Sequence, residues 1–292
     1  MTNSDYVGDL ELPDEALFEF VPHGGFRYIG DGKSILICSS GTAKGLTDSQ
    51  LVEYARAGQE LEDSYASSGY VNQNASSSRV LREKDFRSYE SKYIYKFVTV
   101  DTYERYILNG EFLLSSLDRF RRLEHNKNSA GDRFEGLSTC SYHVRDSQYV
   151  FKTISGYHTF VFSSTRDLQM AMQMQKMFGD VVLRITLSPF RTALTKQLEC
   201  TKSETKLVRY ADYKIFKSRI RQKDLGKYPQ TLCPVLAVTL RNGSRLPTLF
   251  AKPERFALER EVRLAFEMPS DVSDTISITL PNSSAYVERI FV

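Results

Sequence analysis

The pattern of apolar and polar residues along the chain predicts more strands than helices. Short apolar segments predict strands at residues 93–100, 111–116 and 158–165, and the continuous apolar run of the last segment is typical of a buried strand. Further strands are predicted at residues 180–187, 235–240, 274–280 and 285–292. Residues 256–266 also alternate, which would place Glu259, Glu261 and Arg263 on one face of a strand.

Helical signals are fewer. Residues 47–58 and 101–110 each begin with a Thr or Asp three positions before a Gln or Glu, the spacing of a capping box, and each ends at a glycine. A Met-rich helix is expected over residues 166–179, where the methionines are interpreted as soft core packing. Because strands outnumber helices in an irregular order, we expect an α+β fold with a mixed or antiparallel sheet core.

A polar segment predicts a domain boundary. Residues 64–78 are rich in Ser and Asn and have no periodicity, as in a linker. Before it, residues 26–40 read as a hairpin around Gly30-Asp31-Gly32. The expected division is a small β-rich N-terminal appendage (1–63), a linker (64–90) and a main domain (91–292).

Composition and charge narrow the function classes. The formal net charge of +3 and the absence of long Lys or Arg runs make nucleic acid an unlikely partner. No apolar run approaches the roughly 20 residues needed to cross a bilayer. The acidic N-terminus lacks the order of a signal peptide, and four widely separated cysteines give no metal-binding pair. These features predict a cytoplasmic protein with reduced thiols and no metal.

Familiar catalytic motifs are absent from the sequence. It contains no GxGxxG, Walker, HExxH or GxSxG pattern, which weighs against dinucleotide-fold dehydrogenases, P-loop enzymes, zinc proteases and α/β-hydrolases. Its four histidines lie far apart, and a structural or surface role is favoured for each of them.

Three short segments stand out together. They are Tyr95-Lys96-Phe97, Phe162-Ser163-Ser164-Thr165 and Glu259-Arg260-Glu261-Val262. In that order they resemble the ADP-ribosyltransferase superfamily, which has Arg or His on a first core strand, an aromatic-Ser-Thr-Ser strand end and a Glu-x-Glu or Gln-x-Glu motif. The chain departs from this pattern at Lys96, because a Lys lacks the forked geometry of an Arg. The gap from Ser163 to Glu261 is also longer than in compact members.

The resemblance implies a role for each residue. Cleavage of the nicotinamide bond of NAD develops positive charge on the ribose, which a carboxylate stabilises. Glu261 would be this catalytic carboxylate, Glu259 would orient the acceptor and Ser163 would support Glu261. The expected NAD-binding residues are Lys96, Tyr95, Ser164 and Thr165. The alternative is that Glu259 and Glu261 form a solvated strand face paired with Arg260 or Arg263.

A second resemblance covers about residues 93–266. The segment from Tyr95 to Gly136 is similar to the opening of a bacterial and phage family of unknown function, whose Asn-Asp-Pro-Phe-Glu-Gly motif corresponds to residues 131–136 with Arg133 in place of Pro. That family is expected to have an ADP-ribosyltransferase-like core. Within this loop, Asp132 and the glycines could form a tight turn, or Asp132 and Glu135 could line a ligand pocket.

Two functional hypotheses follow. The first is an inhibitory protein on a degenerate ADP-ribosyltransferase-like fold, encoded by a phage or mobile element, whose N-terminal appendage and linker engage the partner. It would act in the host cytosol by sequestering a host protein complex, would need no cofactor and would form a homo-oligomer. The second is an active NAD-dependent ADP-ribosyltransferase, or an NAD glycohydrolase, that modifies protein or nucleic acid.

Overall fold

The computed structural model describes thirteen parts of the chain. They are residues 17–21, 25–29, 34–39, 49, 80–124, 135–144, 147–155, 159–169, 175, 178–200, 202–219, 247–268 and 274–290. Contacts divide the chain into two units. Unit 1 comprises Met1–Glu83, Gly136–Ser155 and Ala211–Thr248, and unit 2 comprises Lys84–Glu135, Gly156–Tyr210 and Leu249–Val292. The predicted division at residues 63 and 90 stays a prediction.

Unit 1 contains a seven-stranded sheet in its described residues, with the order β1-β2-β3-β8-β7-β13-β4. Its strands are β1 (Leu17–Val21), β2 (Gly25–Ile29), β3 (Ser34–Ser39), β4 (Val80–Arg82), β7 (Leu137–Val144), β8 (Ser147–Ser155) and β13 (Ile215–Arg219). β2 and β3 pair antiparallel, as the predicted hairpin requires. β3 also pairs with β8, which lies more than a hundred positions further along the chain. The parallel pairs are β13 with β4 and β13 with β7.

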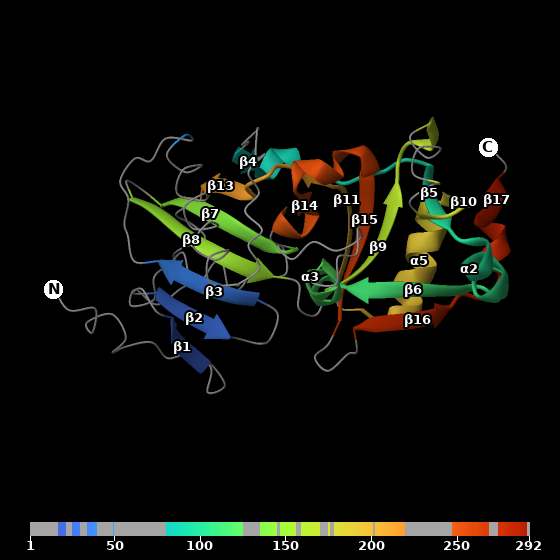
Figure 1. Ribbon diagram of the computed structural model, residues 1–292, viewed down its shortest axis with the longest axis horizontal. Coiled ribbons are helices and arrows are strands. Elements are labelled where there is room, and N and C mark those ends of the chain that lie inside the picture. The colour runs from blue at the N-terminus through green and yellow to red at the C-terminus, as the bar shows by residue number, and fades with distance from the viewer. Residues whose placement is uncertain are drawn as a thin grey trace. The chain divides into compact units, whose positions relative to one another are not determined.

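Unit 2 carries the larger antiparallel sheet, in the order β11-β15-β9-β5-β10-β17, with β6 paired to β9 and β16 paired to β6 (Figure 1). The strands are β5 (Tyr93–Val98), β6 (Glu111–Ser116), β9 (Thr159–Thr165), β10 (Val181–Thr186), β11 (Lys202–Leu207), β15 (Glu261–Glu267), β16 (Thr275–Thr279) and β17 (Val287–Ile290). A short parallel pair joins β12 (Arg209–Tyr210) to β14 (Ala251–Lys252). The fold is α+β and dominated by antiparallel pairing.

Helices are few in the described residues. They are α2 (Val100–Arg105), α3 (Leu117–Glu124) and α5 (Leu187–Leu198), with 3-10 turns η2 (Glu83–Asp85), η3 (Ile107–Asn109), η5 (Pro247–Phe250), η6 (Glu254–Glu259) and η7 (Ser283–Ala285). α2 is capped by Thr99, whose hydroxyl accepts from the Thr102 N–H at 3.1 Å, instead of by Asp101. The left-handed Gly110 closes the turn after it, as predicted.

α5 covers the core of unit 2. Its buried residues Leu187, Phe190, Leu194 and Leu198 recur every three to four positions and so line one face of the helix. The Phe190 ring lies 4.9 Å from the Phe162 ring and 5.2 Å from the Phe112 ring, which ties the helix to β9 and β6. In the described part of the chain, no helix combines the length and the apolar character that crossing a membrane requires.

Most predicted strands of unit 2 are confirmed, but one is wrong in its first half. Residues 254–259 form η6, and β15 begins only at Glu261, because the left-handed Arg260 (φ 42°) breaks the extended backbone. α5 was not predicted, although its apolar spacing is helical. The predicted helix at 47–58 apart from Ser49, the linker up to residue 79 and the strand at 235–240 lie outside the described residues, as does much of the helix at 166–179. The rest of the predicted linker, residues 80–90, contains β4 and η2 and buries Leu81 and Phe86.

Replacing Gly179 with Ala will destabilise unit 2. Its φ of 131° is unfavourable for any residue with a Cβ, and that Cβ would lie 2.3 Å from the backbone of Val98. We expect Gly179→Ala to lower the free energy of unfolding by about 2 kcal/mol or more, measured by urea denaturation with circular dichroism. Gln197→Ala, on the exposed side of α5, is the control and should change it by less than about 0.5 kcal/mol. Equal stability of the two variants would contradict the packing described for Gly179.

Candidate functional site

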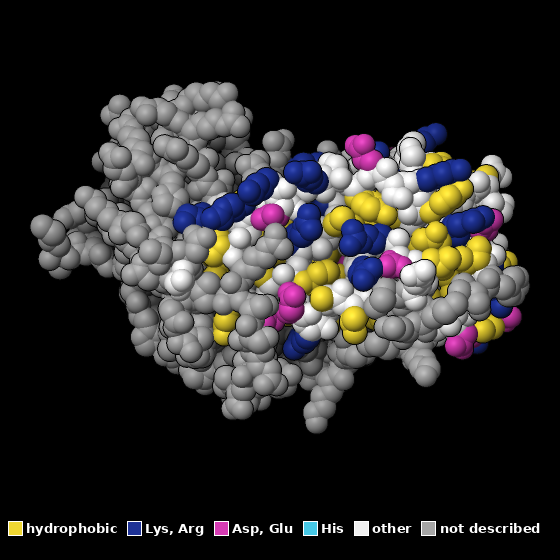
Figure 2. All heavy atoms as spheres, turned by 90° about the horizontal axis from the view of Figure 1, so that it is seen from above, with side chains coloured by type: hydrophobic (Ala, Val, Ile, Leu, Met, Phe, Trp, Pro, Cys, Tyr) yellow, Lys and Arg dark blue, Asp and Glu magenta, His cyan; other side chains and the backbone are white. Residues whose placement is uncertain are grey.

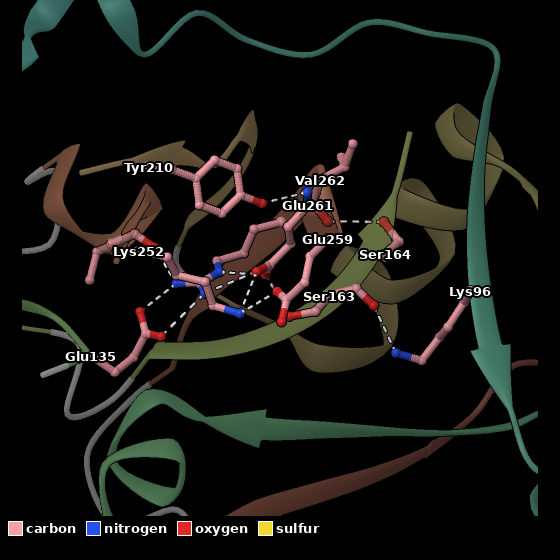
Figure 3. A network of polar contacts seen from close by, with 11 residues as sticks. Lys96, Glu135, Ser163, Ser164, Tyr210, Lys252, Glu259, Glu261 and Val262 are labelled. Carbon is pink, nitrogen blue, oxygen red and sulfur yellow. Dashed lines mark hydrogen bonds and ion pairs between the residues drawn. The ribbon is translucent and has the colours of Figure 1, made fainter. Parts of the chain in front are cut away.

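Two adjacent strands bring Ser163 and Glu261 together. β9 and β15 pair antiparallel, with Ser163 directly opposite Arg263 and therefore diagonal to Glu261 on the same face. The Ser163 hydroxyl donates a hydrogen bond of 2.7 Å to Glu261 Oε1 (Figure 3). Two residues that are 98 positions apart in the chain thus share one hydrogen bond.

Lys96 reaches the same place from β5. Its Nζ donates a 2.7 Å hydrogen bond to the backbone carbonyl of Ser163 (Figure 3). The same nitrogen lies 4.5 Å from the centre of the Phe162 ring. Burial lowers the pKa of Lys96 to about 8, although the nearby carboxylate of Glu261 acts in the opposite direction. The three motif segments therefore meet in space, and the roles assigned to their residues stay predictions.

The Glu261 carboxylate is held by cations. Oε1 accepts from Arg263 Nε at 2.9 Å, and Oε2 lies 2.8 Å from Lys252 Nζ. The side chain is 2% exposed. Burial alone would raise the pKa of Glu261, but Arg263 and Lys252 outweigh it and hold that pKa well below its usual range. Glu261 is therefore buried, ionised and paired on both oxygens, which differs from the solvated face of the alternative interpretation.

Arg263 is the more buried of the two cations that pair with Glu261. Its Nη1 lies 2.7 Å from Glu135 Oε1 and also donates to the backbone carbonyl of Leu249. The guanidinium is 1% exposed, and although burial disfavours its charge, Glu135 and Glu261 raise its pKa. Sequence reasoning treated Glu135 as part of a turn or a pocket, whereas the structure buries it as an ion-pair partner. Asp132 lies outside the described residues.

Lys252 links the two carboxylates of the Glu-x-Glu motif. Its Nζ lies 2.7 Å from Glu259 Oε2 and 2.8 Å from Glu261 Oε2. Burial acts against the charged form of Lys252, but Glu261 and Glu259 outweigh it and raise the pKa. The prediction that Glu259 shares a strand face with Glu261 is wrong, because Glu259 lies on η6. Burial raises the pKa of the Glu259 carboxyl, with Lys252 acting against this change.

The remaining predicted site residues are engaged within the sheet. The Ser164 hydroxyl donates to the Val262 carbonyl at 2.9 Å, and the buried Thr165 hydroxyl accepts from the Asp167 N–H at 3.3 Å. Tyr95 lies on β5 opposite Thr165 and is half-buried. Thr165 lies directly opposite Glu261, whereas Ser164 lies opposite Val262 and has its side chain on the other face of the sheet.

Tyr210 was missed by sequence reasoning. Its hydroxyl oxygen accepts a 2.8 Å hydrogen bond from the backbone N–H of Glu261, at the first residue of β15. Burial raises the pKa of the Tyr210 phenol, and Glu261 adds to this effect. No motif or local spacing marks Tyr210, because the contact forms only when β12 packs beside β15.

The charged residues at and around Glu261 include equal numbers of each sign. This charged group consists of three carboxylates (Glu135, Glu259 and Glu261) and three cations (Lys96, Lys252 and Arg263). A carboxylate has about four positions that accept hydrogen bonds, and in Glu261 these face Ser163, Lys252 and two nitrogens of Arg263. Within the described residues, no group of His, Cys, Asp and Glu side chains is arranged to hold a metal ion.

Replacing Arg263 will destabilise the folded protein. Arg263→Met leaves Glu135 and Glu261 buried without their shared cation, and we expect the free energy of unfolding to fall by about 3–5 kcal/mol. The matched control is Arg105→Met, because Arg105 forms an exposed ion pair with Asp101 one helical turn away. Its effect should be below about 0.5 kcal/mol in the same urea titration. Similar losses in both variants would show that the buried pairing has no special weight.

The low pKa of Glu261 predicts a pH dependence with a definite sign. Because the folded pKa lies below the ordinary value of 4.5, ionised Glu261 stabilises the fold above about pH 4.5, and this contribution declines as the pH falls further. The difference in unfolding free energy between wild type and Glu261→Gln should therefore be largest near neutral pH and shrink towards pH 3. Glu288→Gln, at an exposed ion pair with Arg184, serves as control and should give a flatter profile. A difference that grows on acidification would contradict the assignment.

Comparison of the chain with protein-family models, with curated proteins and with solved structures finds no match. The two resemblances given above therefore rest on the residues that carry them.

Proposed function

We propose that this chain is a protein-binding, inhibitory protein on a degenerate ADP-ribosyltransferase-like core that no longer transfers ADP-ribose. The observation that carries the proposal is the state of Glu261, whose carboxylate is buried and paired with Lys252 and Arg263. The ADP-ribosyltransferase-like core is supported by the meeting of Lys96, Ser163 and Glu261 on neighbouring strands.

Transfer from NAD places two demands on a catalytic carboxylate. It must accept hydrogen bonds from the ribose hydroxyls, and its negative charge must face the cation that develops on the sugar. The acceptor positions of Glu261 already face protein donors. Each cation beside Glu261 would also repel the sugar by about 4 kcal/mol at 4 Å, for an effective dielectric constant near 20. Because the charges of the whole group balance, the site has no excess negative charge for catalysis.

A protein-binding role has support elsewhere in unit 2. None of the residues of α2 is buried, and this helix and the following η3 expose Val100, Tyr106 and Leu108, with Leu108 at 61%. On the face seen in Figure 2, apolar side chains also lie between Lys and Arg side chains. Exposed aromatic and aliphatic residues bordered by polar ones are typical of protein interfaces.

The resemblance to the bacterial and phage family supplies the biological setting of the proposal. A phage or mobile-element protein that binds without catalysis would act by sequestration of a host protein complex, in the host cytosol. Such a role needs no NAD. The exposed segment from Val100 to Leu108 is the surface that we assign to this contact.

A second candidate is an active ADP-ribosyltransferase or NAD glycohydrolase. The hydrogen bond between Ser163 and Glu261 favours it, because the family uses a serine in this way to support its catalytic carboxylate. In this alternative, substrate binding would have to displace Lys252 from Glu261, so that a ribose hydroxyl could take its place.

One experiment separates the two candidates. Purified protein is incubated with labelled NAD and lysate of a bacterial host, beside Glu261→Gln and the control Glu288→Gln. We expect no label transfer and no nicotinamide release from any of the three, because Glu261 is committed to internal pairing. Turnover by wild type and by Glu288→Gln that is lost in Glu261→Gln would reject the proposal and support the second candidate.

Binding is measured with the same lysate. The wild type should retain a host protein that the double variant Tyr106→Ala with Leu108→Asp loses, whereas Glu104→Ala, an exposed polar change on α2, should retain it. Circular dichroism spectra establish that all three proteins are folded. Equal retention by both variants would exclude this segment as the contact surface.

A further inference from the structure

In the described residues, the sheet of unit 2 has three edge strands, β11, β17 and β16, and β16 differs from the other two in its charge. The edge strand β11 carries Lys202, Glu204 and Lys206, and the edge strand β17 carries Glu288 and Arg289. Charged residues on edge strands disfavour pairing with another chain. β16, with the sequence TISIT, contains no charged residue and no proline. It lies beyond β6 at the edge of the sheet (Figure 1).

The hydrogen-bond pattern shows which backbone groups of β16 point away from β6. The Ser116 N–H donates to the Asp274 carbonyl at 2.8 Å, and the Leu280 N–H donates to the Gly110 carbonyl at 2.8 Å. Because these directions alternate along an antiparallel strand, the even-numbered residues from 274 to 280 face β6. The N–H and C=O groups of Ser277 and Thr279 therefore point to the outer edge of the sheet.

The side chains of this strand suit pairing with a copy of itself. Ile276, Ile278 and Leu280 face the core of unit 2, where they pack in the same cluster as Phe190 and Leu194 of α5. Consider β16 paired antiparallel with β16 of a second copy, with the two-fold axis beside Ile278. Ser277 then lies opposite Thr279 of the second copy, and Ile278 lies opposite Ile278. Ile276 then lies opposite Leu280. Every pair joins apolar with apolar or hydroxyl with hydroxyl, and no charges are opposed.

An exposed leucine lies on the strand next to this edge. Leu113 lies on β6 directly opposite Ser277, on the outer face of the sheet, and is 57% exposed. A strand added beside β16 would be the second neighbour of β6, about 10 Å away at the usual strand spacing, so it would extend the face that carries Leu113 without pairing with this residue.

We propose that β16 is a self-association edge, at which two copies of this chain pair antiparallel through Ser277 and Thr279 to form one continuous sheet. About four backbone hydrogen bonds join the copies in this register. The contact is small, so the dimer dissociates readily on dilution. This inference does not rest on the proposed function, since it uses neither Glu261 nor the segment from Val100 to Leu108.

Sedimentation velocity of the full chain over a concentration series tests the proposal. Wild type should shift from monomer to dimer as its concentration rises. Ser277→Pro removes an N–H that points away from β6, so the internal ladder is kept while two hydrogen bonds between the copies are lost. We expect it to raise the dimer dissociation constant at least about tenfold. The matched control, Ser277→Ala, keeps the N–H and should dimerise like wild type.

A charge exchange makes the test independent of any loss of folding. Ser277→Lys with Thr279→Lys, and Ser277→Glu with Thr279→Glu, each place like charges opposite one another and should be monomeric alone. An equimolar mixture places Lys opposite Glu and should restore the dimer. Wild type that stays monomeric throughout, a dimer of Ser277→Pro as strong as that of wild type, or a mixture that stays monomeric would each overturn the proposal.

Discussion

The buried pairing of Arg263 with Glu261 and Glu135 organises the core around the candidate site. Arg263 is fully enclosed, so its charge depends on the two carboxylates, and each carboxylate depends on it in turn. Removal of one member leaves an uncompensated charge in a poorly hydrated place. The pairing joins residues that are 128 positions apart, so it holds Glu135 against β15 within unit 2.

The same pairing is the basis of the proposal that this core binds a partner without catalysis. Ser163 and Glu261 have the hydrogen bond that the family resemblance leads one to expect. Lys252 and Arg263 then take the positions on Glu261 that a sugar would need. In this arrangement the Glu261 carboxylate joins β15 to β9 and to Lys252. Function on this core is therefore expected at its surface, where exposed residues of α2, η3 and β16 are available.

Much of the sheet could be predicted from the sequence, because short apolar strands such as β5, β6 and β9 carry their signal locally. The meeting of Lys96, Ser163 and Glu261 followed from the ordered motifs. Glu135, Lys252 and Tyr210 could not be found in this way, since their partners are distant in the chain. η6 was missed because FALERE alternates like a strand, and only the conformation of Arg260 separates it from β15.

That left-handed Arg260 has a wider consequence. It turns the chain between Glu259 and Glu261, so the two carboxylates approach Lys252 from a 3-10 turn and from a strand. Exchange of side chains alone cannot align them as neighbours along one strand. A design that aims to bring both carboxylates onto one strand face must therefore first change the main chain at position 260.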